Sequence, residues 1–197
     1  MAYPKHIDPD SGFRLPLPRR DTLDAEGQRH YDEATSRAGG RLKGLKGPSG
    51  IQLYSPGYAR VAQPVNRYLR FEAGFSPRLR ETAILVAARE MDSAFEWAAH
   101  EPEALRSGVP AAVVEAIKGR KATDGLEAQD AVLIALGREL FRSKRLSQAT
   151  FDQAVKLWGP EGLVNLVALM GNYAGTAMLL AAFDMQLDDG DVRLPVP

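Results

Sequence analysis

The sequence predicts an all-α protein, and three observations support this fold class. From Ser55 onward most apolar residues recur at helical spacing, as Leu79, Ala83, Val86 and Ala87 do along one stripe. No segment of useful length alternates apolar and polar residues as a half-buried strand does. Prolines, glycines and capping serines separate the apolar runs, and these are the residues that begin and end helices.

The first part of the chain is expected to hold one helix between two irregular segments. Residues 1–20 contain four prolines and are predicted to form an extended arm. A first helix is predicted over residues 21–38, followed by a glycine-rich connector over residues 39–50. The connector contains lysines, but it does not match the phosphate-binding pattern GxxxxGK[ST], because Leu45 follows Gly44.

Start and stop signals divide the remaining chain into further helices. Ser76 and Pro77 predict the N-cap and first residue of one helix, and Ser93 begins the next. Later elements are a short helix after Pro110, helices over residues 127–141 and 147–158, and a long apolar helix after the break at Gly159 and Pro160.

Length and charge limit the classes to which the protein can belong. The 197 residues suit one helical domain, assigned to residues 21–187, with the arm before it and a polar tail over residues 188–197. The 25 basic and 25 acidic residues give no net charge, which argues against nucleic-acid binding. Residues 1–20 lack the apolar core of a signal peptide, and the chain has no cysteine, so a cytoplasmic location is expected.

One uncharged segment is long enough to cross a bilayer. It runs for 21 residues, from Leu163 to Phe183. Asn165, Asn172 and Thr176 interrupt it, and no Lys or Arg lies close to either end to set an orientation. The segment is therefore predicted to be a buried helix, within the domain or at a subunit interface, and no membrane partner is expected.

Three side chains that can exchange protons are expected to meet between two neighbouring helices. Glu96 and His100 are four residues apart, so they project from the same face of a helix. A carboxylate beside an imidazole orients the ring and raises its basicity, which suits proton transfer. Glu81 belongs to the preceding helix, next to apolar residues, where a carboxylate needs a partner or a proton.

Each of these residues also has a purely structural interpretation. Glu96 has the spacing of a capping-box partner of Ser93, His100 can be a hydrogen-bonded core histidine, and Glu81 can be a solvated residue paired with an arginine. No metal is expected, because two of the three histidines fall in the arm and the first helix and no full ligand set is present.

The stretch from Glu81 to Pro102 resembles the carboxymuconolactone decarboxylase family, whose superfamily includes the alkylhydroperoxidase D-type proteins. The hydroperoxidase members carry the pattern Glu-x11-Cys-x2-Cys-x3-His. In this chain the same spacing reads Glu81, Ser93, Glu96 and His100, so the Glu and His match while both cysteines are replaced. The resemblance extends over roughly residues 40–185 and points to the cysteine-free, decarboxylase-like branch.

The resemblance implies an all-helical protein that assembles as homotrimers or homohexamers, with the site near a subunit boundary. It implies decarboxylation of a small lactone such as 4-carboxymuconolactone, without a cofactor. Thiol peroxidase activity is not expected, because that chemistry needs a reactive thiolate and a resolving thiol, and the chain has no cysteine.

Within that hypothesis His100 donates the proton, Glu96 orients His100, and Glu81 completes the relay. Arg80 or Arg70 is expected to bind a second substrate carboxylate, and spacing does not choose between them; Trp97 is a further predicted substrate-binding residue. Two other functions remain open: a different acid–base enzyme on the same scaffold, such as a hydrolase or isomerase, and a non-catalytic oligomer that binds a small ligand.

Overall fold

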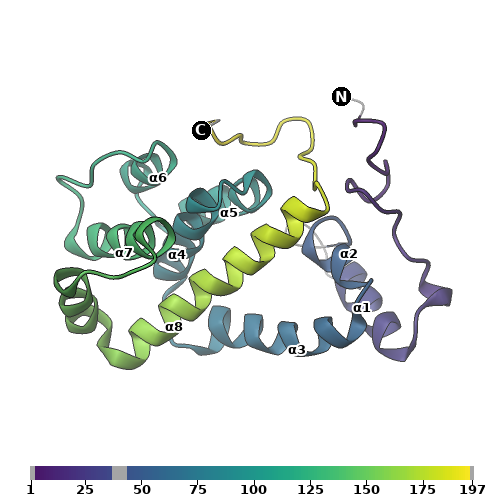
Figure 1. The fold of residues 1–197 in the computed structure, drawn as a ribbon, viewed down its shortest axis with the longest axis horizontal. Coiled ribbons are helices and arrows are strands. Elements are labelled where there is room, and N and C mark those ends of the chain that lie inside the picture. Colours follow the sequence, from purple (N-terminus) through teal and green to yellow (C-terminus); the bar gives the residue numbers. More distant parts are fainter. Residues whose placement is uncertain (1–2, 37–43, 196–197) are drawn as a thin grey trace.

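The computed structural model describes residues 3–36 and 44–195, and every regular element in these ranges is helical. This confirms the predicted all-α fold class. The helices pack around a main apolar core, and the N-terminal arm and the C-terminal tail lie on the same side of the molecule (Figure 1). The α-helices are α1 (Ala25–Ser36), α2 (Pro48–Gln52), α3 (Pro56–Arg67), α4 (Pro77–Glu90), α5 (Ala94–Arg106), α6 (Ala111–Lys118), α7 (Ala128–Arg138) and α8 (Gln148–Ala182).

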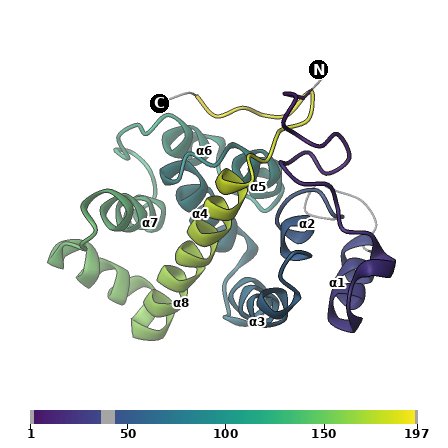
Figure 2. The same cartoon turned by 45° about the vertical axis from the view of Figure 1, so that its right-hand side comes forward.

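Helix α4 lies at the centre of the molecule. It packs against α5, α6, α7 and α8, which surround it in both ribbon views (Figures 1 and 2). All of its residues from Leu79 to Arg89 are buried, although the sequence predicts one apolar stripe. A helix covered on every side has to bury its polar residues as well, and these need partners. Gly137 lets α7 come close, because a Cβ at this position would collide with Val86 of α4.

The predicted helix boundaries around the site are confirmed. The Ser76 hydroxyl accepts a hydrogen bond from the Leu79 amide at 3.2 Å, which caps α4. Ser147 caps α8 in the same way through the Thr150 amide. Within α8 the backbone of Gly159 has φ 68° and ψ 173°, so the helix breaks at this glycine as expected.

Two predictions near the N-terminus need correction. The first helix begins at Ala25 rather than at residue 21, because the Asp24 carboxylate accepts a hydrogen bond from the Gly27 amide at 2.7 Å and so caps the helix there. The last residues of the predicted helix and the first part of the connector lie outside the described residues. The end of the connector is not a loop, because Pro48–Gln52 forms α2.

The N-terminal arm is extended, and it packs against the rest of the chain. Phe13 is fully buried in a second apolar cluster with Ile51, Phe95 and Leu180. The Arg14 amide donates to the carbonyl of Phe183 at 3.0 Å, just after α8 ends. The arm is therefore part of the folded unit in the described ranges.

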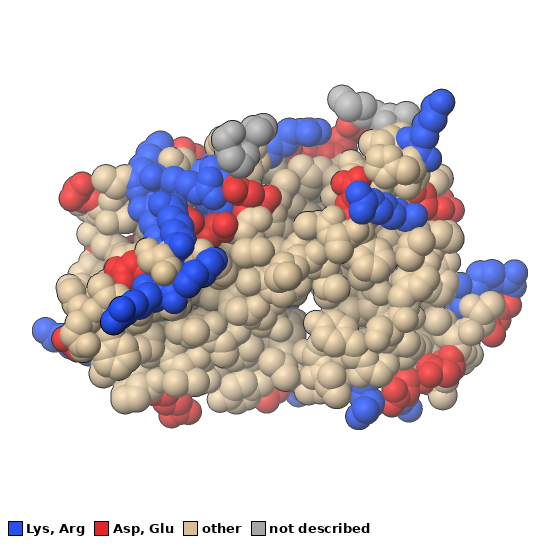
Figure 3. Space-filling model, in the orientation of Figure 1, with Lys and Arg blue, Asp and Glu red and all other residues tan. Residues whose placement is uncertain are grey.

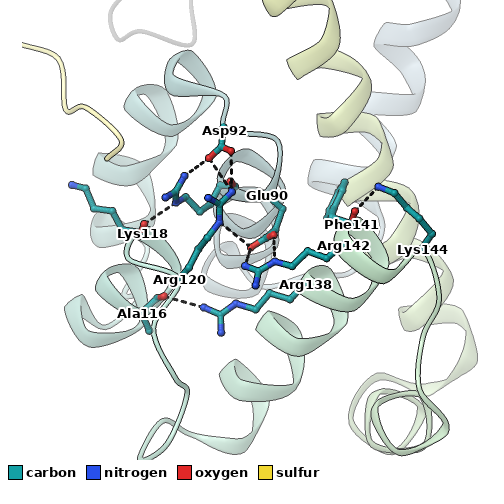
Figure 4. A network of polar contacts seen from close by, with 10 residues as sticks. Glu90, Asp92, Ala116, Lys118, Arg120, Arg138, Phe141, Arg142 and Lys144 are labelled. Atoms are coloured by element: carbon teal, nitrogen blue, oxygen red, sulfur yellow. Dashed lines mark hydrogen bonds and ion pairs between the residues drawn. The ribbon is translucent and has the colours of Figure 1, made fainter. Parts of the chain in front are cut away.

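A network of arginines joins the C-terminal ends of α4, α6 and α7 (Figure 4). Arg89 and Arg138 donate to backbone carbonyls in the last turn of α6, and Arg120 donates to the carbonyl of Arg89. Arg142 binds Glu90 of α4 through two N–H groups, each at 2.6 Å. Helix ends leave carbonyls without partners, so this network has a clear structural role.

Helix α8 is the one helix in the described ranges that is long and apolar enough to cross a membrane, judged by length and composition alone. One face of it packs on α4 and α7. The other face is exposed, with Val164 at 65% and Met178 at 64% exposure. Few charges interrupt the broad surface that α8 forms with α3 (Figure 3).

We expect Phe13→Ala to lower the free energy of unfolding by about 3 kcal/mol or more, because it removes a fully buried ring from the second cluster. Phe151→Ala is the control, since Phe151 is 44% exposed, and its cost should be about 1 kcal/mol at most. Denaturant unfolding of both variants measures this. Equal losses would contradict the packing of the arm.

Candidate active site

The buried side chain of Glu81, on α4, meets that of His100, on α5. His100 Nδ1 lies 2.6 Å from Glu81 Oε2, and the two side chains are 1% and 0% exposed. With its proton on Nδ1, the ring donates a short, charge-assisted hydrogen bond to the carboxylate. That bond fixes the ring, so Glu81 is the residue that orients His100.

Glu96 faces the other nitrogen of the same ring. Its Oε2 lies 3.5 Å from His100 Nε2, one turn away on α5. Ser93 makes no side-chain cap hydrogen bond, so the capping-box interpretation of Glu96 is wrong. Glu96 was also expected to orient His100, but the shorter contact belongs to Glu81.

The two glutamates have pKa values that move in opposite directions. Burial raises the pKa of Glu81, but the hydrogen bond and charge of His100, with further help from Arg80 and Arg70, outweigh it and leave this pKa below the ordinary value. Burial also raises the pKa of Glu96, and here it outweighs the charges of His100 and Arg70. Glu96 therefore keeps its proton to a higher pH than Glu81.

The His100 and Glu96 side chains border a cavity of about 1090 Å³. Residues from α1, α2, α3, α5 and α8 line the cavity, together with Arg70 from the short π-helix η2 (Tyr68–Glu72) that follows α3. Glu96 and His100 line it, whereas Glu81 lies behind His100. Figure 3 shows a hollow between α8 and α3 on the face that these helices form. A small molecule in the cavity can reach the imidazole and Glu96.

The structure separates the two arginines that the sequence left as alternatives. Arg80 donates to Glu81 Oε1 and to the backbone carbonyl of Arg70, each at 3.0 Å, and it does not line the cavity. Arg70 does line the cavity. Both guanidinium groups lie over the ring of Phe71, at 4.9 Å for Arg70 and 5.3 Å for Arg80.

Trp97 is placed in the core. Its side chain is fully buried, and its indole N–H donates to Glu101 Oε2 at 2.9 Å. Because it does not line the cavity, a molecule bound there does not touch it. Trp97 directly follows Glu96, so it projects to another side of α5.

Two residues of the cavity have no signal in the local sequence. The ring of Tyr173, on α8, meets the His100 ring edge-on at 5.1 Å, and burial raises the pKa of its phenol. His30, on α1, is buried at the cavity wall, where Nε2 contacts the carbonyl of Ser49 at 2.8 Å and Nδ1 contacts Gln63. Only long-range packing brings these two residues to the site.

No cluster of three or more His, Asp or Glu side chains suited to a metal ion occurs in the described part of the chain. The cavity does bring together an oriented imidazole, a carboxyl group with a raised pKa beside it and a nearby guanidinium, and such groups are suited to proton transfer.

Comparison with solved structures identifies the fold. A protein from Ralstonia eutropha JMP134, described as an alkylhydroperoxidase AhpD core and an uncharacterized peroxidase-related protein, matches with a TM-score of 0.67 at 14% identity over 95% of each chain. This chain has the alkylhydroperoxidase D-like fold. The apo debrominase Bmp8 has the same fold, with a TM-score of 0.66 at 17% identity, covering 88% of this chain and 91% of that one.

A third structural neighbour is a protein of unknown function from Agrobacterium tumefaciens, whose description names it as a putative antioxidant defence protein AhpD. It matches with a TM-score of 0.62 at 14% identity, over 70% of this chain and 94% of that one. No family model and no curated protein matches the sequence. At these identities the comparisons establish the fold alone, and the reaction has to be inferred from the residues of the site.

The opposite pKa shifts predict opposite pH dependence for two matched variants. Glu81→Gln should lower the free energy of unfolding by about 3 kcal/mol at neutral pH, because it breaks a buried pair. A lowered pKa stabilises the fold above the ordinary glutamate pKa, so this loss should shrink as the pH falls through the folded pKa.

Glu96→Gln should behave in the reverse way. Because the pKa of Glu96 is raised in the folded protein, ionisation of Glu96 destabilises the fold. As the pH rises, the free energy of unfolding of the variant should therefore increase relative to that of the wild type, by up to about 1.4 kcal/mol per pH unit until the folded pKa is passed. Urea unfolding between acid and neutral pH checks both variants. The same pH trend in the two variants would contradict this assignment.

Proposed function

We propose that this protein is a cofactor-independent acid–base enzyme that decarboxylates a small carboxylated lactone, such as 4-carboxymuconolactone. One observation carries the proposal: His100 is held from behind by Glu81 and turns its other nitrogen towards Glu96 in a cavity. A histidine fixed in this way, beside a carboxyl group whose pKa burial raises, is suited to protonating carbon.

The reaction breaks the bond between the ring carbon and the leaving carboxylate. Carbon dioxide departs, and its electron pair stays on the substrate, where it spreads into the conjugated ring system. A proton from the His100–Glu96 pair then bonds to carbon, and the pair regains a proton from solvent. Glu81 does not line the cavity, so it acts as a positioning residue that stabilises the protonated imidazole.

The debrominase neighbour supports a small-molecule substrate. A cysteine-to-alanine variant of that protein has been solved in complex with 2,3,4-tribromopyrrole, a small ring compound. This chain contains no cysteine, so we carry over only the size class of the ligand and not a thiol mechanism.

A second candidate is another acid–base reaction on a larger molecule. The cavity, of about 1090 Å³, lies just above the range of roughly 300–1,000 Å³ that is typical of pockets for drug-sized ligands. A lactone with one small ring fills only part of such a space. A hydrolase or isomerase acting on a larger substrate would use the same His100–Glu96 pair.

Carbon dioxide release from 4-carboxymuconolactone tests the first candidate. We expect turnover by the wild type and a loss of about 10²–10⁴-fold in kcat/KM for His100→Gln, the range for one acid–base group. His6→Gln is the matched control, because His6 does not line the cavity, pairs with Asp184 and is well exposed, so full activity is expected.

Two outcomes would contradict this assignment. Full turnover by a folded His100→Gln variant would remove His100 from the reaction. No release by a folded wild-type protein would reject this substrate and favour the second candidate or a ligand-binding role.

We also propose that the protein assembles as a homo-oligomer, a trimer or hexamer, through the exposed face of α8. No charged residue interrupts α8 between Leu163 and Phe183, yet its outer side chains are uncovered. Large exposed apolar patches mark interaction sites. A second copy is the partner that the family resemblance favours.

Light scattering of wild-type protein and of Val164→Glu tests this assembly. We expect a trimer or hexamer for the wild type and a smaller particle for the variant, because a charge at a 65% exposed position disrupts contacts between copies without entering the core. Leu105→Glu, at a 47% exposed position on α5, should leave the particle unchanged. A monomeric wild type would overturn the proposal.

A further inference from the structure

The guanidinium of Arg70 has an N–H group with no partner. Among the described residues, Arg70 Nε is the one buried side-chain nitrogen or oxygen atom without a hydrogen bond. No ion pair between Arg70 and a carboxylate is found in the described ranges either, and the guanidinium of Arg70 lies 4.9 Å from the centre of the Phe71 ring. A buried donor of this kind is costly for the protein unless something else accepts from it.

The position of Arg70 is held from behind. The Nη1 group of Arg80 donates to the backbone carbonyl of Arg70 at 3.0 Å, while Nε of Arg80 binds Glu81. The same arginine therefore connects the turn that carries Arg70 with the carboxylate that orients His100. Short π-helices such as η2 are frequent at functional sites.

The side chain of Arg70 shares the cavity wall with Glu96, His100 and Tyr173. The charge of Arg70 acts to lower the pKa values of Glu81, Glu96 and Tyr173, although burial outweighs this effect for Glu96 and Tyr173. Arg70 is thus within electrostatic reach of the groups that we assign to proton transfer. The rings of Phe71, Phe95 and Tyr173 supply flat apolar surface in the same cavity.

We propose that Arg70 is the anion anchor of this cavity, and that the substrate is a small, flat acid whose carboxylate accepts hydrogen bonds from Arg70 while its ring faces His100 and Glu96. A planar guanidinium pairs with a carboxylate through two parallel N–H donors, which satisfies Nε and fixes the orientation of the acid. The inference rests on the proposed function only in taking the cavity ligand to be the substrate.

Calorimetric titration with benzoate, and with benzamide as its uncharged analogue, tests the anchor without any need for turnover. We expect the wild type to bind benzoate at least tenfold more tightly than benzamide. Arg70→Gln should lose that preference. Arg70→Lys, which keeps the charge but not the two parallel N–H donors, should retain part of it. Arg106→Gln removes an exposed charge on another helix, α5, and should bind benzoate like the wild type.

Circular dichroism of each variant establishes that it is folded before titration. Equal benzoate affinity in folded Arg70→Gln and wild type would overturn the proposal, as would a wild type that binds benzamide as tightly as benzoate or binds neither. Because the titration reads binding alone, loss of benzoate affinity in Arg70→Gln supports the anchor even if 4-carboxymuconolactone is not turned over.

Discussion

The buried hydrogen bond between Glu81 and His100 is the interaction on which the site depends. It joins the central helix α4 to α5 at 2.6 Å, and neither side chain is open to solvent. An ionised carboxylate in such a place is costly unless it is fully paired, and the imidazole and Arg80 together provide the pairing. In return the carboxylate fixes which nitrogen of His100 faces the cavity.

Glu81 and Glu96 contact the same imidazole ring, that of His100, but they have different roles. Glu81 is surrounded by donors and holds its charge, whereas Glu96 is buried with less compensation and favours its proton. Two carboxyl groups whose environments separate their pKa values are what acid–base catalysis requires. The two arginines differ in a similar way. Arg80 donates hydrogen bonds within the protein, whereas Arg70 Nε has no partner among the described residues and is proposed to bind a ligand.

The sequence predicts the parts of this arrangement that local periodicity controls. The i,i+4 spacing of Glu96 and His100 and the cap at Ser76 follow from helix geometry alone. The partner of His100 Nδ1 does not, because it depends on how α4 packs against α5. For the same reason the sequence could not distinguish Arg70 from Arg80, or find Tyr173, which reaches the site from the distant helix α8.

Titration of the side-chain carboxyl groups by carbon-13 NMR, with Glu81→Gln and Glu96→Gln to assign the signals, measures the two pKa values directly. We predict that Glu81 titrates below and Glu96 above the ordinary glutamate value of about 4.3. We also predict that His100→Gln raises the pKa of Glu81, because the interaction that lowers it is lost. Two carboxyl groups that titrate together, or in the reverse order, would contradict the division of roles between Glu81 and Glu96.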